Sequence, residues 1–140
     1  MNLFDTLENK RKTINLSENK KIKIYVCGIT PYSESHIGHA MSAVIFDTLR
    51  KYLLANKQNV TYVQNFTDID DKLIKAAKEN NSDIKTISTK FINKHLSALS
   101  KLNVLKPDYS PKATEEIKEM INMIETLISK DMAYEIDGDC

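Results

Sequence analysis

The chain has 140 residues, the size of one ordinary domain, with 20 basic and 19 acidic side chains and a formal net charge of +1. This balance excludes a histone-like protein, and 41% hydrophobic with 28% charged residues excludes a wholly disordered one. Uncharged stretches fall short of the roughly 20 apolar residues of a membrane helix, and the N-terminus lacks a signal-peptide pattern. We therefore expect a cytoplasmic protein with no membrane contact. Two cysteines, Cys27 and Cys140, fit a reducing compartment.

The first 23 residues carry a net charge of +3, concentrated in six basic side chains separated by Asn and Ser: Lys10, Arg11, Lys12, Lys20, Lys21 and Lys23. This composition favours a solvated loop before the first strand. Contact with nucleic-acid phosphates is the weaker alternative, because three net charges are little electrostatic evidence.

Strands and helices are expected to alternate along the next 55 residues. A β-branched and aromatic run predicts a strand over 23–27, and a loop follows over 28–35. Apolar residues spaced by three and four predict a helix that begins near 36–38 and buries Met41, Val44, Ile45, Leu49 and Leu53. A second strand is predicted over 60–65. Thr67 or Asp68 is expected to cap the helix after it.

Two longer helices are predicted over 82–103 and 111–130, with Ser82 and Ser110 as N-caps. Their apolar stripes are Ile84, Ile87, Phe91, His95, Ala98 and Leu102 in the first, and Ile117, Met120, Ile121, Ile124, Leu127 and Ile128 in the second. His95 lies on its stripe, so we interpret it as a packed residue rather than a ligand. A strand is expected over 134–136, before a turn.

Alternating strands and helices favour an α/β fold with a parallel sheet, in which ligands bind where strands end. The loop after the first strand leads into His36-Ile37-Gly38-His39. Gly38 lets a flat ring approach the backbone, and free N–H groups at a helix start attract phosphate. His36 and His39 lie on one helical face, where both can donate to a phosphate oxygen.

An acidic cluster, Asp68, Asp70 and Asp71, follows the second strand. Such clusters can bind magnesium. We favour capping instead, because carboxylates at a helix start accept from its first N–H groups and complement its dipole.

Three segments together resemble the cysteinyl-tRNA synthetases, which are class I aminoacyl-tRNA synthetases. These segments are Tyr25-Val26-Cys27-Gly28-Ile29-Thr30, His36-Ile37-Gly38-His39 and Asn65-Phe66-Thr67-Asp68-Ile69-Asp70-Asp71-Lys72. The resemblance covers nearly the whole chain, from Leu3 to Tyr134. It implies the first half of a Rossmann-like parallel-sheet catalytic domain, truncated, with residues 1–132 in that half and 133–140 at the start of the connective insertion.

The resemblance also implies roles for individual residues. Cys27 matches one ligand of a single zinc ion whose remaining ligands lie outside this chain, and a thiolate suits a metal that must also bind a thiolate substrate. Gly28, Thr30 and Thr67 border the cysteine pocket. Three residues of the signature contact ATP, namely His36, Gly38 and His39, and the two histidines among them are catalytic.

In the full-length protein the implied activity is that of a cysteine–tRNA ligase, which activates cysteine with magnesium-bound ATP and passes it to tRNA(Cys) as a monomer. The second ATP signature of the family, Lys-Met-Ser-Lys-Ser, is absent from the 140 residues. We therefore expect this chain alone to be inactive.

Two alternatives remain open. With its proline at position 31, the sequence also resembles the mycothiol cysteine ligases. These enzymes activate cysteine as well but pass it to an amino sugar. The other alternative is a non-catalytic fragment or nucleotide-binding remnant that keeps the fold.

Overall fold

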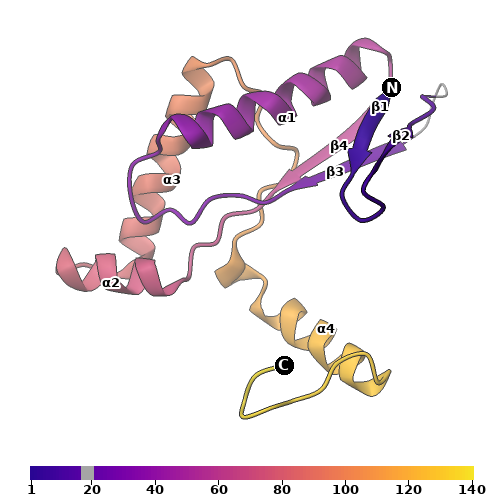
Figure 1. Cartoon of the computed structure of the whole chain (residues 1–140). Coiled ribbons are helices and arrows are strands. Elements are labelled where there is room, and N and C mark those ends of the chain that lie inside the picture. Colours follow the sequence, from indigo (N-terminus) through magenta and orange to yellow (C-terminus); the bar gives the residue numbers. More distant parts are fainter. Residues whose placement is uncertain (17–20) are drawn as a thin grey trace.

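The computed structural model describes residues 1–16 and 21–140. In the described part, the secondary-structure elements in chain order are β1 (Asn2–Asp5), β2 (Lys10–Thr13), β3 (Lys21–Val26), α1 (Ile37–Ala55), β4 (Asn59–Gln64), α2 (Asp71–Glu79), α3 (Ile84–Lys101), the short 3-10 helix η1 (Ala113–Glu115) and α4 (Ile117–Ser129). Figure 1 shows α1 lying along the β3–β4 pair. Helices α2 and α3 lie at the end of the pair where the two strands finish (Figure 1).

The sheet is built from β3 and β4, which pair in parallel from Lys21↔Asn59 to Val26↔Gln64. Helix α1 connects them, as parallel strands require a crossover. An extended segment, 108–112, runs parallel to β4 on its other edge, where Gln64 N donates to Tyr109 O at 3.1 Å and Phe66 N donates to Pro111 O at 2.9 Å. These pairings confirm the predicted α/β fold with a parallel sheet, as in the first half of a Rossmann-like domain.

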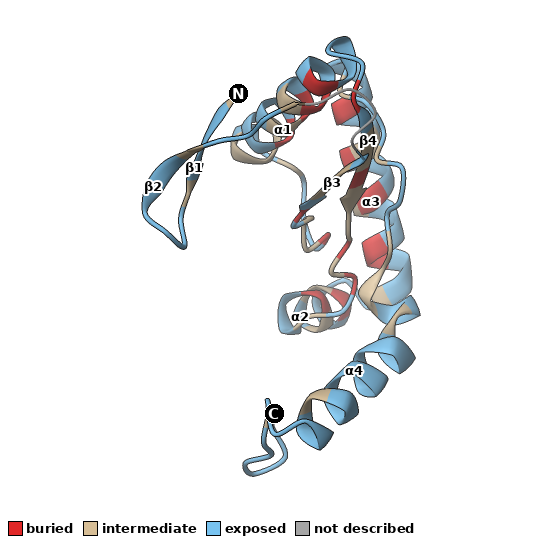
Figure 2. Ribbon diagram, turned by 90° about the vertical axis from the view of Figure 1, so that its right-hand side faces the viewer, coloured by how far each residue is buried: buried red, intermediate tan, exposed pale blue. Residues whose placement is uncertain are grey.

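The buried residues lie on the inner faces of the helices and along β4 (Figure 2). Leu53 of α1 and Leu73 of α2 are almost fully buried, and α2 packs against α3 through Leu73, Ala77 and Ile87. The buried face of α3 runs through Ile87, Ser88, Ile92, His95 and Leu99. Ala98 and Leu102, which the periodicity placed on this face, are exposed.

Helix α1 has the predicted start but buries a different face. Its buried residues are Ala43, Asp47, Arg50 and Leu53, whereas Met41, Val44 and Ile45 are exposed. The polar residues are buried because segment 105–108 supplies their partners: Leu105 N donates to Asp47 Oδ1 at 3.0 Å, and Arg50 donates to Lys106 O at 2.6 Å.

The predicted caps of α2 and α3 were off by one to three residues. Asp70, not Thr67 or Asp68, caps α2 by accepting from Lys72 N at 2.8 Å. Asp83, not Ser82, caps α3 through Thr86 N at 2.8 Å. An N-cap needs extended backbone and a side-chain acceptor in reach of the second or third helical N–H, and the fold gives that geometry to the two aspartates.

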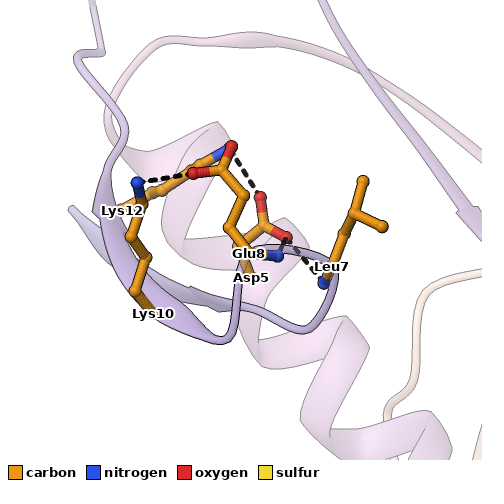
Figure 3. A network of polar contacts seen from close by, with 5 residues as sticks. All are labelled: Asp5, Leu7, Glu8, Lys10 and Lys12. Carbon is orange, nitrogen blue, oxygen red and sulfur yellow. Dashed lines mark hydrogen bonds and ion pairs between the residues drawn. The ribbon is translucent and has the colours of Figure 1, made fainter.

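The predicted N-terminal loop is wrong over residues 2–13, which form an antiparallel hairpin of β1 and β2. Figure 3 shows Lys12 between Asp5 and Glu8, with Asp5 at 2.7 Å, while Lys10 pairs with Glu8 at 2.6 Å. The Lys12 ammonium holds the pKa of Asp5 below its ordinary value. Acidic partners on the hairpin therefore neutralise part of the basic cluster, and Lys20 of that cluster lies outside the described residues.

The C-terminal predictions also need correction. Residues 110–112 belong to the edge segment along β4, so α4 begins at Ile117 after η1, and Ser110 is not its cap. Residues 134–136 form no strand; Ile136 makes a single antiparallel bridge with Asp139 across a turn. Helix α4 extends away from the sheet (Figure 1), and none of its residues 117–129 is buried.

Within residues 1–16 and 21–140, no helix has the length and apolar character that a bilayer crossing demands.

Candidate active site

The loops that follow β3 and β4 are joined by hydrogen bonds at the carboxyl edge of the sheet. Gly28 N donates to Asn65 Oδ1 at 2.8 Å, and Thr67 N donates to Ile29 O at 3.1 Å. Because β3 and β4 are parallel and in register, both loops leave the sheet at the same edge. The structure therefore brings Gly28 and Thr67, predicted from segments 39 residues apart, into one place.

Cys27 follows the last residue of β3 and carries an exposed, free thiol. Thr30 and Thr67 are half-buried in the two joined loops. Pro31 is almost fully buried, so the start of the loop is anchored while the thiol faces solvent. This arrangement leaves Cys27 free to bind a soft metal or a thiol-reactive group.

Helix α1 begins with its two histidines in a reciprocal cap. His36 Nδ1 accepts from Gly38 N at 3.1 Å, and His39 Nδ1 accepts from His36 N at 3.2 Å. The rings of His36 and His39 stack with centroids 3.9 Å apart. This is a capping box in which imidazoles take the places that Ser and Glu usually occupy.

The capping bonds determine which ring nitrogen can donate to a ligand. A nitrogen that accepts a hydrogen bond carries no proton, so each neutral ring holds its proton on Nε2. Partial burial, and the proximity of His36, hold the pKa of His39 below its ordinary value and favour this neutral form. His36 and His39 therefore present two Nε2–H donors beside the positive end of a 19-residue helix. Such a site can bind an anion and stabilise charge that grows on it.

His95 also belongs to the site, although the helical periodicity of the sequence did not predict this. It is buried, as predicted, but it lies against His39 and hydrogen-bonds with Ser35, which directly precedes His36. No local pattern indicated this, because His95 and Ser35 are 60 residues apart.

The acidic cluster is used structurally. Asp70 caps α2, and the buried Asp68 accepts from Thr114 N at 2.9 Å and from its hydroxyl at 2.6 Å. The Asp70 contact supports the capping interpretation, whereas the Asp68 contacts tie the loop after β4 to η1. Across the part of the chain that the structure describes, no three His, Cys, Asp or Glu residues gather closely enough to hold a metal ion. Cys27 is thus a chemically suitable zinc ligand, but the described residues do not complete a zinc site around it.

Comparison with known proteins identifies relatives along the whole chain. Residues 13–140 match the family model of the class I (C) tRNA synthetase catalytic domain. The chain is 49% identical over 140 residues to a cysteine–tRNA ligase of Archaeoglobus fulgidus, covering 99% of this chain and 30% of that protein. It is 46% identical over 137 residues to that of a Geobacillus species and 45% identical over 138 residues to that of Dehalococcoides mccartyi, covering 98% and 99% of this chain. The chain spans about 30% of the length of these relatives.

Proposed function

Because this chain belongs to the class I (C) tRNA synthetase catalytic-domain family, we propose that its full-length protein is a cysteine–tRNA ligase. In this reaction the cysteine carboxylate attacks the α-phosphate of ATP, pyrophosphate leaves, and the cysteinyl group passes from the adenylate to tRNA(Cys). ATP enters as its magnesium complex. The proposal assigns residues 1–132 to the first half of the Rossmann-like catalytic domain, which carries one of the two ATP signatures, and 133–140 to the start of the connective insertion.

The observation that carries the proposal is the reciprocal cap of His36 and His39. Both Nδ1 atoms are committed to backbone amides, at 3.1 and 3.2 Å, which leaves both Nε2–H groups for a ligand. Negative charge on the α-phosphate oxygens grows as the carboxylate attacks, so these fixed donors stabilise the transition state more than bound ATP. Gly38, between the histidines, gives the nucleotide close access to the first turn of α1.

The experiment is cysteine-dependent ATP–pyrophosphate exchange by the protein expressed from its complete gene. We expect His36→Ala and His39→Ala each to lower the exchange rate on the order of 10²-fold, with a smaller change in the affinity for ATP. Thr48→Ala is the matched control, because Thr48 is an exposed residue of the same helix that bonds to its own backbone at Val44. Equal losses of rate and affinity would instead identify the two histidines as ground-state binding groups.

Cysteine recognition is assigned to Gly28, Thr30 and Thr67, with Cys27 as one zinc ligand. Bound zinc would coordinate the substrate thiolate and discriminate against serine, whose hydroxyl is a poorer ligand. The support is that Cys27 offers an exposed thiol at the strand end, beside the loops that carry the other three residues.

Zinc content tests this assignment independently of catalysis. Cys27→Ala should lower the zinc bound per protein and cysteine activation together, whereas Cys140→Ala, at the other exposed thiol, should change neither. Unchanged zinc content in Cys27→Ala would contradict the assignment. The acceptor is tested with tRNA(Cys): a protein that forms cysteinyl adenylate but does not charge tRNA would be a ligase with a different acceptor.

A further inference from the structure

We propose that His95 is a positioning residue for the histidine pair at the start of α1, acting through its hydrogen bond to Ser35 and its ring contact with His39. The inference rests on the proposed function, because it assigns His95 to the same site. It departs from the expectation that His95 is a core residue alone.

The first support is a hydrogen bond between distant segments. Ser35 Oγ and His95 Nδ1 are 2.8 Å apart, and Ser35 is the residue immediately before His36. Beside this bond, Lys94 of α3 pairs with Glu34. Two consecutive residues of α3 therefore hold the two residues that lead into the cap of α1. Since His36 has no helix before it, these contacts restrain the direction in which the chain enters the cap.

The second support is a row of rings that connects the sheet with the site. The His95 ring meets both Phe66 and His39 edge-on, with ring centroids 6.4 Å apart in each pair. His39 in turn stacks on His36 at 3.9 Å. Phe66 is buried near the end of β4, so the row runs from the sheet to the helix start. A shift of His95 is therefore transmitted to His39 by direct contact.

The burial of His95 makes this contact rigid. The residue is 4% exposed and lies beside a small cavity of about 20 Å³, close to the volume of one water. A truncation to alanine would enlarge this cavity and destabilise the core regardless of any role in positioning. Shape-conserving variants are therefore needed.

Three variants separate the hydrogen bond from the packing. His95→Phe keeps an aromatic ring but removes the bond to Ser35. Ser35→Ala removes the same bond from its other end and leaves the His95 ring in place. His95→Asn loses part of the ring but keeps a polar atom near the position of Nδ1, so it is the rescue variant. All are made in the protein expressed from its complete gene, and the free energy of unfolding is measured for each.

We expect His95→Phe and Ser35→Ala each to lower kcat for cysteine-dependent pyrophosphate exchange by about tenfold, with the KM for ATP changed less than about twofold, because misdirected donors cost rate more than binding. The double variant should lose no more than either single variant, since both remove one bond. His95→Asn should recover most of the rate.

A second measurement does not depend on activity. In the protein labelled with ¹⁵N-histidine, long-range ¹H–¹⁵N spectra report which ring nitrogen of His39 carries the proton. We expect a single Nε2–H form in the wild type, and a mixture of both neutral forms in Ser35→Ala and His95→Phe.

Unchanged kcat in the folded variants, or an unchanged His39 ring form, overturns the inference and leaves His95 as a packing residue. This result is distinct from failure of the proposed function. If His36→Ala and His39→Ala lose the exchange rate while the Ser35 and His95 variants keep it, the positioning role alone is wrong. If the histidine pair itself proves dispensable, the proposed function fails, whatever the ring spectra show.

Discussion

Gly28 and Asn65 lie so close together that a β-carbon at position 28 would be 1.5 Å from the Asn65 carbonyl oxygen. The obstacle is backbone, which cannot rotate away as a flexible side chain can. The Asn65 side chain also holds this approach in place, because its Oδ1 accepts from Gly28 N at 2.8 Å. The close approach of the two loops at the candidate site therefore requires glycine at this position.

Gly28→Ala should lower the free energy of unfolding by about 3 kcal/mol or more, because the loops after β3 and β4 must separate to admit the methyl group. Gly138→Ala is the control. Gly138 has a φ of +87°, but a methyl group added to it would meet no atom within 4 Å, so only backbone strain of about 1 kcal/mol is expected. Urea unfolding measures both. Similar losses of unfolding free energy in the two variants would show that the close approach of Gly28 to Asn65 does not explain the destabilisation.

Arg50 links α1 to the segment that runs beside β4. It is 7% exposed, and it donates to Asp108 Oδ1 at 2.9 Å, while Asp108 Oδ2 accepts from Tyr62 N at 2.7 Å. Arg50→Met keeps most of the volume but leaves the carboxylate without its cation, so we expect a loss of about 3 kcal/mol. Lys75→Met, which breaks the exposed pair between Lys75 and Glu79 of α2, should cost less than about 1 kcal/mol. The free energy of unfolding of both variants is measured by thermal or urea unfolding. Equal losses in the two variants would contradict the proposed role of Arg50.

Asp70 and Asp71 are adjacent carboxylates with different environments. Asp70→Ala removes the cap of α2 and should cost about 1 kcal/mol. Asp71→Ala loses only a favourable position in the first turn and should cost less than about 0.5 kcal/mol. Added magnesium should leave the free energy of unfolding unchanged in both variants. A magnesium-dependent stability that disappears in both would support a cation site instead.

Stability should fall as the pH is lowered through the histidine range. Burial, followed by the proximity of the neighbouring histidine, holds the pKa values of His95 and His39 below the ordinary value in the folded chain. The unfolded chain, with pKa values of about 6.5, therefore binds more protons as the pH drops below about 7, and the folded state loses stability until its own histidines titrate.

This pH dependence is measured as the free energy of unfolding between pH 7.5 and 5. His95→Gln should reduce the slope, because it removes the more deeply buried of the two rings. The pKa of Asp83 is also lowered, but it affects stability only below this pH range, since carboxylates titrate near pH 4. A slope that is unchanged in His95→Gln would show that the burial of His95 does not set the pH dependence.

Much of the candidate site could be predicted because its residues lie in short, local patterns. His36, Gly38 and His39 fall within four positions, so the first turn of α1 and its cap bring them together. The end of the first strand was predicted at residue 27, one residue beyond the observed end of β3 at Val26, and the start of α1 was predicted near 36–38 from the change of periodicity. Their assignment to a nucleotide site came from the family resemblance rather than from spacing.

The alternation of strands and helices, and the proximity of His36 to His39 at the start of a helix, follow from the sequence alone, whereas the reciprocal cap of the pair was seen only in the structure. Tertiary structure decided which face of α1 is buried, since Asp47 and Arg50 find their partners in residues 105–108. It also decided that His95 meets Ser35 and His39, and that Gly28 meets Asn65. Periodicity reports a side chain's neighbours within a turn or a strand. Contacts between segments 37 to 60 residues apart depend on how whole elements pack, and that packing leaves no periodic mark in the chain.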